Sequence, residues 1–171
     1  TFDGVDDQLA LPNGLMDTAA SKTVELWFRT SSSGVLLGYQ NTLATSYVPA
    51  IYVGTDGKLY GKLWNGLVPL RTSATLVNDN QWHHAAIVGD IAGATQSLYL
   101  DGALVGSVSG AQTVLGMNVN QIGLGYASAG WPATNPGAFP FAGEIDDVRL
   151  WSTARSQAEI QASMNTTLAG T

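Results

Sequence analysis

The sequence has no cysteine, few charged residues and very few basic ones. Asp, Glu, Lys and Arg make up 12% of the 171 residues, and seven of them are Lys or Arg. Without cysteine, neither a disulfide framework nor a thiolate metal site can form. The basic residues are scattered singly and the net charge is −6, so no binding of nucleic acid, anionic membranes or other polyanions is expected.

Long apolar runs are also missing. No stretch of 18 or more apolar residues occurs, so no membrane insertion is expected. A chain of 171 residues with 45% hydrophobic residues is long enough and apolar enough to bury a core. We therefore interpret residues 1–171 as a single domain.

The patterns that are present are those of short strands. Residues 23–30 alternate strictly, with Val24, Leu26 and Phe28 on one face. Gly, Asn, Asp and Ser interrupt the chain at short intervals, which is typical of an all-β sandwich. Asp-Gly pairs accept the positive φ of a tight turn and predict two hairpins, at Asp56-Gly57 and at Asp101-Gly102.

The C-terminal part predicts a strand followed by the one clear helix. Residues 141–151 read as a half-buried strand. Ser156 and Glu159 have the spacing of a capping box, in which each side chain accepts a hydrogen bond from the other residue's backbone N–H. Ile160 and Met164 follow one helical turn apart and predict a narrow apolar stripe.

The segment 126–140 contains three prolines and cannot be a central strand, so we predict a long surface loop. Residues 39–49 are irregular and are expected to form part of the same rim. Exposed aromatic rings stack on the apolar faces of sugars, and nearby amides orient the hydroxyl groups. The predicted sugar-binding residues are Trp131, Trp64, Tyr39, Tyr47, Tyr126, Asn65 and Asn135.

Two motifs suggest catalysis but are better explained by structure. His83 and His84 are adjacent on a predicted strand, so they point to opposite faces and cannot chelate one ion together. Glu144 and Asp146 share a face, but the second glutamate that a retaining glycosidase needs is missing. We therefore expect no catalytic residues and no enzyme activity.

Three blocks in order give the chain a family resemblance: residues 2–7, residues 80–88 followed by 98–102, and residues 143–156. Together they resemble the laminin G-like, concanavalin A-like jelly roll. The resemblance implies an antiparallel β-sandwich of jelly-roll type, with one short C-terminal helix, paired first and last strands, and neighbouring termini. The pattern begins at residue 2, so we expect a module of a larger exported protein, secreted or on the cell surface of a bacterium.

The resemblance also implies a structural calcium ion. In this superfamily the aspartate of an Asp-x-Val-Arg strand often ligates calcium together with the N-terminal segment, and residues 146–149 fit that pattern. Calcium prefers carboxylate and carbonyl oxygens. The predicted ligands are Asp3, the Gly4 carbonyl, Asp6 and Asp146, with Asp7 in the same acidic group.

A fold of this kind hosts many activities, so function has to be read from a site. The function favoured by the sequence is non-catalytic, lectin-like binding of a carbohydrate or cell-surface glycan. The alternative is a module that binds a protein partner in interaction or adhesion. A glycoside hydrolase is the third reading.

Overall fold

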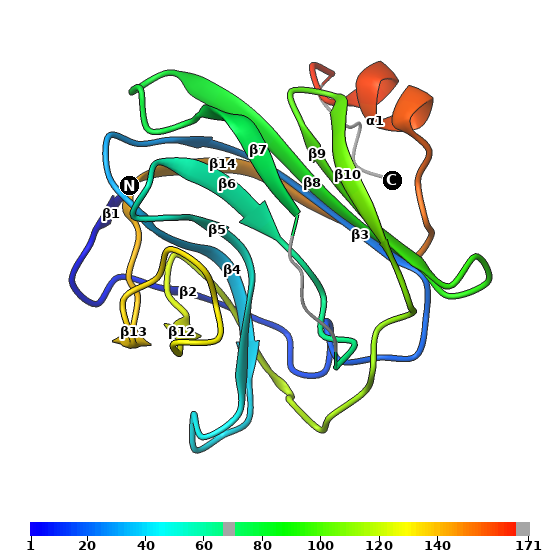
Figure 1. Cartoon of the computed structure of the whole chain (residues 1–171), viewed down its shortest axis with the longest axis horizontal. Helices are drawn as coiled ribbons and strands as arrows, with labels where there is room; N and C mark the ends of the chain where they lie inside the picture. Colours follow the sequence, from blue (N-terminus) through cyan, green and yellow to red (C-terminus); the bar gives the residue numbers. More distant parts are fainter. Residues whose placement is uncertain (67–70, 167–171) are drawn as a thin grey trace.

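The computed structural model describes residues 1–66 and 71–166, and within them two six-stranded antiparallel sheets face each other (Figure 1). The first sheet has the order β1 (Phe2–Asp3), β14 (Ala142–Trp151), β3 (Lys22–Arg29), β8 (Trp82–Asp90), β9 (Thr95–Leu100), β10 (Ala103–Ser109). The second has the order β2 (Leu9–Leu11), β11 (Val119–Ile122), β4 (Gly34–Gln40), β5 (Tyr47–Val53), β6 (Lys58–Gly61), β7 (Arg71–Leu76).

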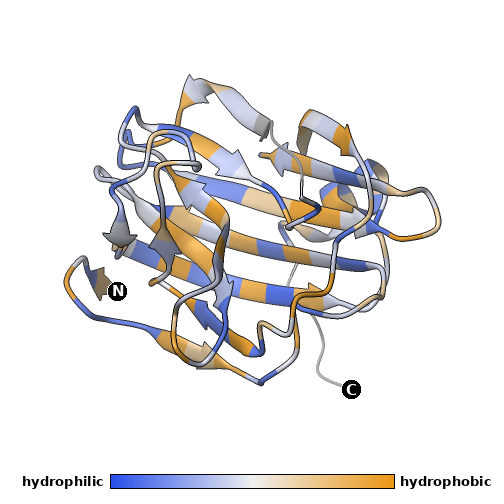
Figure 2. Ribbon diagram, turned by 60° about the horizontal axis from the view of Figure 1, so that its bottom comes forward, coloured by the Kyte–Doolittle hydropathy of each residue, from blue (hydrophilic) through white to orange (hydrophobic). Residues whose placement is uncertain are grey.

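The predicted jelly-roll β-sandwich is confirmed, and alternation along the strands builds its core. Val24, Leu26 and Phe28 of β3 are fully buried between the sheets, as their spacing predicts. Figure 2 shows hydrophobic and hydrophilic residues alternating along several strands. The predicted hairpins join β5 to β6 and β9 to β10, and both residues of the second turn, Asp101 and Gly102, have a positive φ.

The first and last strands pair, as expected: Phe2 lies opposite Gly143 and Asp3 opposite Ala142. They meet at the beginning of β14, whereas the helix α1 (Gln157–Ser163) follows the end of this ten-residue strand. Figure 1 shows β1 and α1 on opposite sides of the molecule. The expectation that the two ends of the chain lie close together is therefore wrong for the residues described.

The helix α1 begins with the predicted capping box between Ser156 and Glu159. Its buried residue Ile160 packs against Ala86, Val88 and Tyr99 on the outer face of the first sheet. Arg149 of β14 donates to the carbonyl oxygens of Ser163 (2.6 Å) and Thr166 (2.7 Å), where carbonyl groups at a helix end need donors. No helix among the described residues is long and apolar enough to cross a membrane.

Candidate functional site

The outer face of the second sheet carries a row of aromatic and basic side chains. Alternation continues beyond β6: Leu59 and Leu63 are buried in the core, and Gly61 faces Leu98 of the first sheet. The residues between them, Tyr60, Lys62 and Trp64, therefore point away from the first sheet.

The predicted loop 126–140 lies against this face. It includes the short strands β12 (Tyr126–Ala127) and β13 (Gly137–Ala138), which pair with each other. Tyr52 of β5 donates its hydroxyl hydrogen to the Pro132 carbonyl (2.7 Å), and the Thr55 backbone N–H donates to the Ala133 carbonyl (2.8 Å). These bonds hold the middle of the loop on the β5–β6 hairpin.

Two tryptophans from distant parts of the sequence meet there. The ring centroids of Trp64 and Trp131 are 6.2 Å apart and their planes are inclined by 47°. Trp131 is 8% exposed and forms the wall of the site, whereas Trp64 is partly exposed. Of the two rings, Trp64 offers the surface on which a sugar can stack.

The backbone of Trp64 is fixed on both sides. Its N–H donates to the hydroxyl oxygen of Tyr39 (2.9 Å), and its carbonyl accepts from the Thr113 N–H (2.7 Å). Tyr39 is 1% exposed, so the prediction that its ring faces a sugar is wrong. Burial raises the pKa of the Tyr39 phenol well above its ordinary value, which keeps the hydroxyl neutral. Tyr39 supports Trp64 from within the sandwich.

The other predicted sugar-binding residues lie near the Trp64–Trp131 pair or form a second aromatic pair. Tyr47 and Tyr126 are both partly exposed, and their ring centroids are 5.9 Å apart. Asn65 follows Trp64 and donates to the Ser109 carbonyl (3.2 Å). Asn135 is exposed on the loop. The structure therefore brings four of the seven predicted residues into two aromatic pairs, and it buries two of the seven, Tyr39 and Trp131, in the core.

Lys62 belongs to the same face and was not predicted. It is 2% exposed, and its ammonium nitrogen lies 5.9 Å from the centroid of the Trp64 ring. Desolvation lowers the pKa of Lys62 below its ordinary value. The signal was present in the sequence, because Tyr60, Lys62 and Trp64 are spaced two residues apart and share a strand face.

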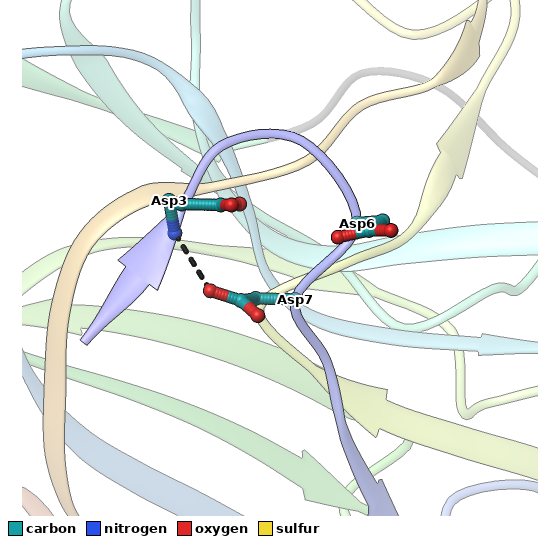
Figure 3. A group of neighbouring side chains, drawn as sticks. All are labelled: Asp3, Asp6 and Asp7. Atoms are coloured by element: carbon teal, nitrogen blue, oxygen red, sulfur yellow. Dashed lines mark hydrogen bonds between the residues drawn. The ribbon is translucent and has the colours of Figure 1, made fainter.

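The acidic cluster of the N-terminal turn is shown in Figure 3. One carboxylate oxygen each of Asp3, Asp6 and Asp7 lie within 4.8 Å of one another, and all three residues are exposed. Asp7 accepts from the Asp3 N–H (3.0 Å), and Asp3 accepts from the Val5 N–H (2.8 Å). Three neighbouring carboxylates suit a hard cation such as calcium, which takes oxygen ligands.

Asp146 does not join this cluster. Asp3 pairs with Ala142, and Asp146 lies four residues further along β14, about 13 Å away at strand spacing. A bulge between Asp146 and Arg149 follows, and the Asp146 carboxylate accepts from the Asp147 N–H (2.8 Å). Gly4 lies in the N-terminal turn with a φ of 81°, next to Ala142. Its carbonyl remains a predicted ligand of the cluster.

The histidines and the glutamate that were considered for catalysis contact charged side chains of the same chain. The two ring nitrogens of His83 lie 2.9 Å from Asp101 and 3.2 Å from Asp79, whereas His84 points to the other face and lies 3.4 Å from Glu25. Glu144 forms an ion pair with Arg29 (2.7 Å). The Glu144 carboxylate is therefore paired with an arginine, whereas a retaining glycosidase needs a second carboxyl group near the first.

Two clefts lie elsewhere on the surface. One, of about 470 Å³, is lined by Asn13, Thr18, Leu150 and Trp151 among others, at the end of β14. Another, of about 440 Å³, runs between the edge strands β7 and β10 and includes Leu104 and Val105. Neither cleft is lined by a residue of the predicted sugar site.

Comparison with known proteins places this geometry in a family. The structure of a heptameric SAP-like pentraxin from Limulus polyphemus matches with a TM-score of 0.64 and 17% identity, over 96% of this chain and 81% of that one. The CBM40 of the Ruminococcus gnavus IT-sialidase, bound to α2,3 sialyllactose, matches with a TM-score of 0.62 and 14% identity, over 92% and 96%.

Domains LG4-5 of the mouse laminin α1 chain match with a TM-score of 0.60 and 18% identity, over 92% of this chain and 42% of that one. At such identities the likeness concerns the fold. No curated protein matches in sequence. The family model described as the concanavalin A-like lectin/glucanases superfamily matches residues 3–161, and the chain therefore belongs to that superfamily.

Proposed function

We propose that this chain is a non-catalytic, carbohydrate-binding module of a larger exported protein, secreted or on the surface of a bacterial cell. The observation that carries the proposal is the meeting of Trp64 and Trp131 on the outer face of the second sheet, 6.2 Å apart. Trp64 is held rigidly from both sides, and a platform fixed before the ligand arrives loses little entropy on binding.

The comparisons support this function at the level of the fold. The matched CBM40 is bound to sialyllactose, and another matched structure is described as a putative carbohydrate-binding protein from Bacteroides ovatus. Sialidase and arabinanase structures are also among the matches, which fits a module that accompanies enzymes. In this chain the ion pair between Glu144 and Arg29 argues against hydrolysis.

The test is a glycan array followed by calorimetric titration of the best ligand. Trp64→Ala should weaken binding about fivefold, since stacking on an aromatic ring is worth on the order of 1 kcal/mol. Trp82→Ala is the matched control, because Trp82 is 41% exposed but lies on β8 of the first sheet. Equal losses in the two variants, or no binding to any glycan, would contradict the proposed site.

A protein-binding function is the alternative, and one observation favours it. Leu104 lines the cleft between β7 and β10 and is 49% exposed, and Leu76 at the end of β7 is 56% exposed. Exposed apolar patches often mark protein interfaces. A partner captured by the wild-type chain and lost in Leu104→Asp, with no glycan binding in either, would favour this alternative.

We further propose that the turn of Asp3, Asp6 and Asp7 holds a structural Ca²⁺ ion, with the Gly4 carbonyl as an additional ligand. The cluster is exposed, and an ion that binds only the folded chain stabilises it by mass action, about 2.7 kcal/mol at a hundredfold excess over the dissociation constant. Calcium should raise the melting temperature of the wild type and of Asp146→Ala, but not that of Asp6→Asn. A wild-type melt unchanged by EDTA and by calcium would exclude the ion.

A further inference from the structure

Lys62 is almost wholly buried, yet its ammonium group has no hydrogen-bonding partner within the part of the chain that the structure describes. The residue is 2% exposed, and no carboxylate, carbonyl or other acceptor among the described residues forms an ion pair or hydrogen bond with it. Among these residues it contacts the ring of Trp64, with its nitrogen 5.9 Å from the centroid, the outer limit of a cation–π interaction.

The other buried lysine shows what a paired ammonium looks like in this fold. Lys22 is 6% exposed and donates to three oxygens: the carbonyls of Met16 (2.9 Å) and Thr18 (2.8 Å) and the side chain of Gln112 (2.8 Å). An ammonium can donate three hydrogen bonds, so Lys22 is saturated. Lys62 has the same three donors, and none of them is bonded to an acceptor among the described residues.

Burying a charge without a partner destabilises a protein, and an anion that enters the site relieves that cost. Lys62 and Trp64 are two residues apart on one strand face, so their side chains start about 7 Å apart and point the same way. Trp131 closes the site on one side. A cation beside an aromatic platform suits a ligand that has both an anionic group and an apolar ring face.

We propose that Lys62 makes the Trp64 site selective for sugars that carry a carboxylate, such as uronic or sialic acids. This inference rests on the proposed carbohydrate-binding function and names the ligand class of the same site. The sugar ring stacks on Trp64, and the carboxylate, which projects from the edge of the ring, accepts hydrogen bonds from the Lys62 ammonium.

A carboxylate-bearing sugar fits the charge of the molecule better than a polyanion. The chain carries a net charge of −6, which repels long, highly charged polymers, whereas a single carboxylate needs one buried cation. A single contact of this kind discriminates between two ligands that differ only in the acid group. Selectivity then depends on the ratio of two affinities.

The experiment compares matched acidic and neutral ligands, each acidic one with a single carboxylate, by titration calorimetry: 3′-sialyllactose with lactose, and methyl galacturonoside with methyl galactoside. We expect at least one acidic ligand to bind tenfold or more tightly than its neutral partner. The pair that shows the difference identifies a sialic or a uronic acid. Lys62→Met should abolish the preference, and Lys62→Arg should retain it.

Lys58→Met is the matched control, because Lys58 lies on the same face of β6, four residues earlier. Equal affinities for acidic and neutral ligands in the wild type would overturn the inference and leave the carbohydrate function standing, provided that binding depends on Trp64. A preference unchanged in Lys62→Met, or a stronger preference for sulfated sugars, would also overturn it. Absence of all glycan binding would overturn both proposals.

Discussion

The two outer faces of the sandwich differ in whether a buried charged side chain has an oppositely charged partner. On the first sheet, Glu25 is fully buried beneath the C-terminal segment, and Arg155 pairs with it at 2.7 Å. On the second sheet, the aromatic face buries Lys62 without a counter-charge among the described residues. In the first arrangement the opposite charge comes from within the chain, and in the second we propose that a bound anion supplies it. On this proposal, the difference separates residues that hold the fold from residues that bind a ligand.

The largest effect is expected on the first face. Glu25→Ala should reduce the free energy of unfolding by about 3–5 kcal/mol, because it leaves the Arg155 guanidinium buried without its carboxylate. Arg155 also donates to the Glu159 carbonyl and the Ser163 hydroxyl (2.8 Å each), so docking of α1 should loosen as well. Urea unfolding and hydrogen exchange of α1 measure the two effects.

The control for Glu25→Ala is Glu144→Ala. Glu144 forms its ion pair with Arg29 at the surface, where the two side chains are 34% and 39% exposed. Such surface pairs contribute about 0–1 kcal/mol to the free energy of unfolding. If the two alanine variants were destabilised equally, the buried pair would have no special role in holding the helix.

The two buried lysines should respond to the same substitution with opposite signs. Lys22→Met leaves two carbonyls and the Gln112 oxygen without their donor, so we expect a loss of about 2–4 kcal/mol. Lys62→Met removes a buried charge that has no partner among the described residues, so stability should stay constant or increase by about 1 kcal/mol. Urea midpoints of the two variants measure the contrast, and a large loss in Lys62→Met would show that Lys62 has a structural partner.

A smaller effect is expected from Tyr39→Phe, which removes the acceptor of the Trp64 N–H but keeps the buried ring. An unsatisfied buried N–H costs about 1–2 kcal/mol. The platform should become less rigid, so glycan affinity should fall together with stability. Tyr47→Phe is the control, since Tyr47 belongs to the other aromatic pair. Unchanged affinity in Tyr39→Phe would show that Trp64 is positioned without it.

Much of the fold could be predicted because its signals are local. The alternation in β3, the Asp-Gly turns and the capping box of α1 each fix a short segment, and all are confirmed. The family blocks predicted the pairing of β1 with β14. The separation of the two chain ends was missed, because it depends on where along β14 the short first strand pairs.

The candidate site was less predictable because it depends on how distant segments meet. The aromatic residues of the loop were found, and Trp131 does contact Trp64. The burial of Tyr39 could not be predicted from alternation along β4, because nearly all residues of this strand are buried, whichever face they lie on. Lys62 resembles any exposed lysine in the sequence, and its burial appears only in the folded chain. Asp146 was misplaced because the register of β1 on β14 was unknown.

A further effect concerns pH, and it distinguishes Lys22 as a buried base. Desolvation lowers the pKa of Lys22 from 10.5 to about 8, against the charge of Asp17, which raises it. Between these values the unfolded chain binds a proton that the folded chain has lost, so stability rises as pH increases from about 8 toward 10.5. The stability gained when Lys22 is neutral is therefore fully present above pH 10.5, and it is lost as pH falls to about 8. We expect a gain of about 1–3 kcal/mol, at 1.36 kcal/mol per pKa unit. Urea midpoints at pH 8 and pH 10 should show this gain in the wild type and a smaller one in Lys22→Met. An identical pH dependence in the two proteins would mean that Lys22 titrates in the folded state as it does in water.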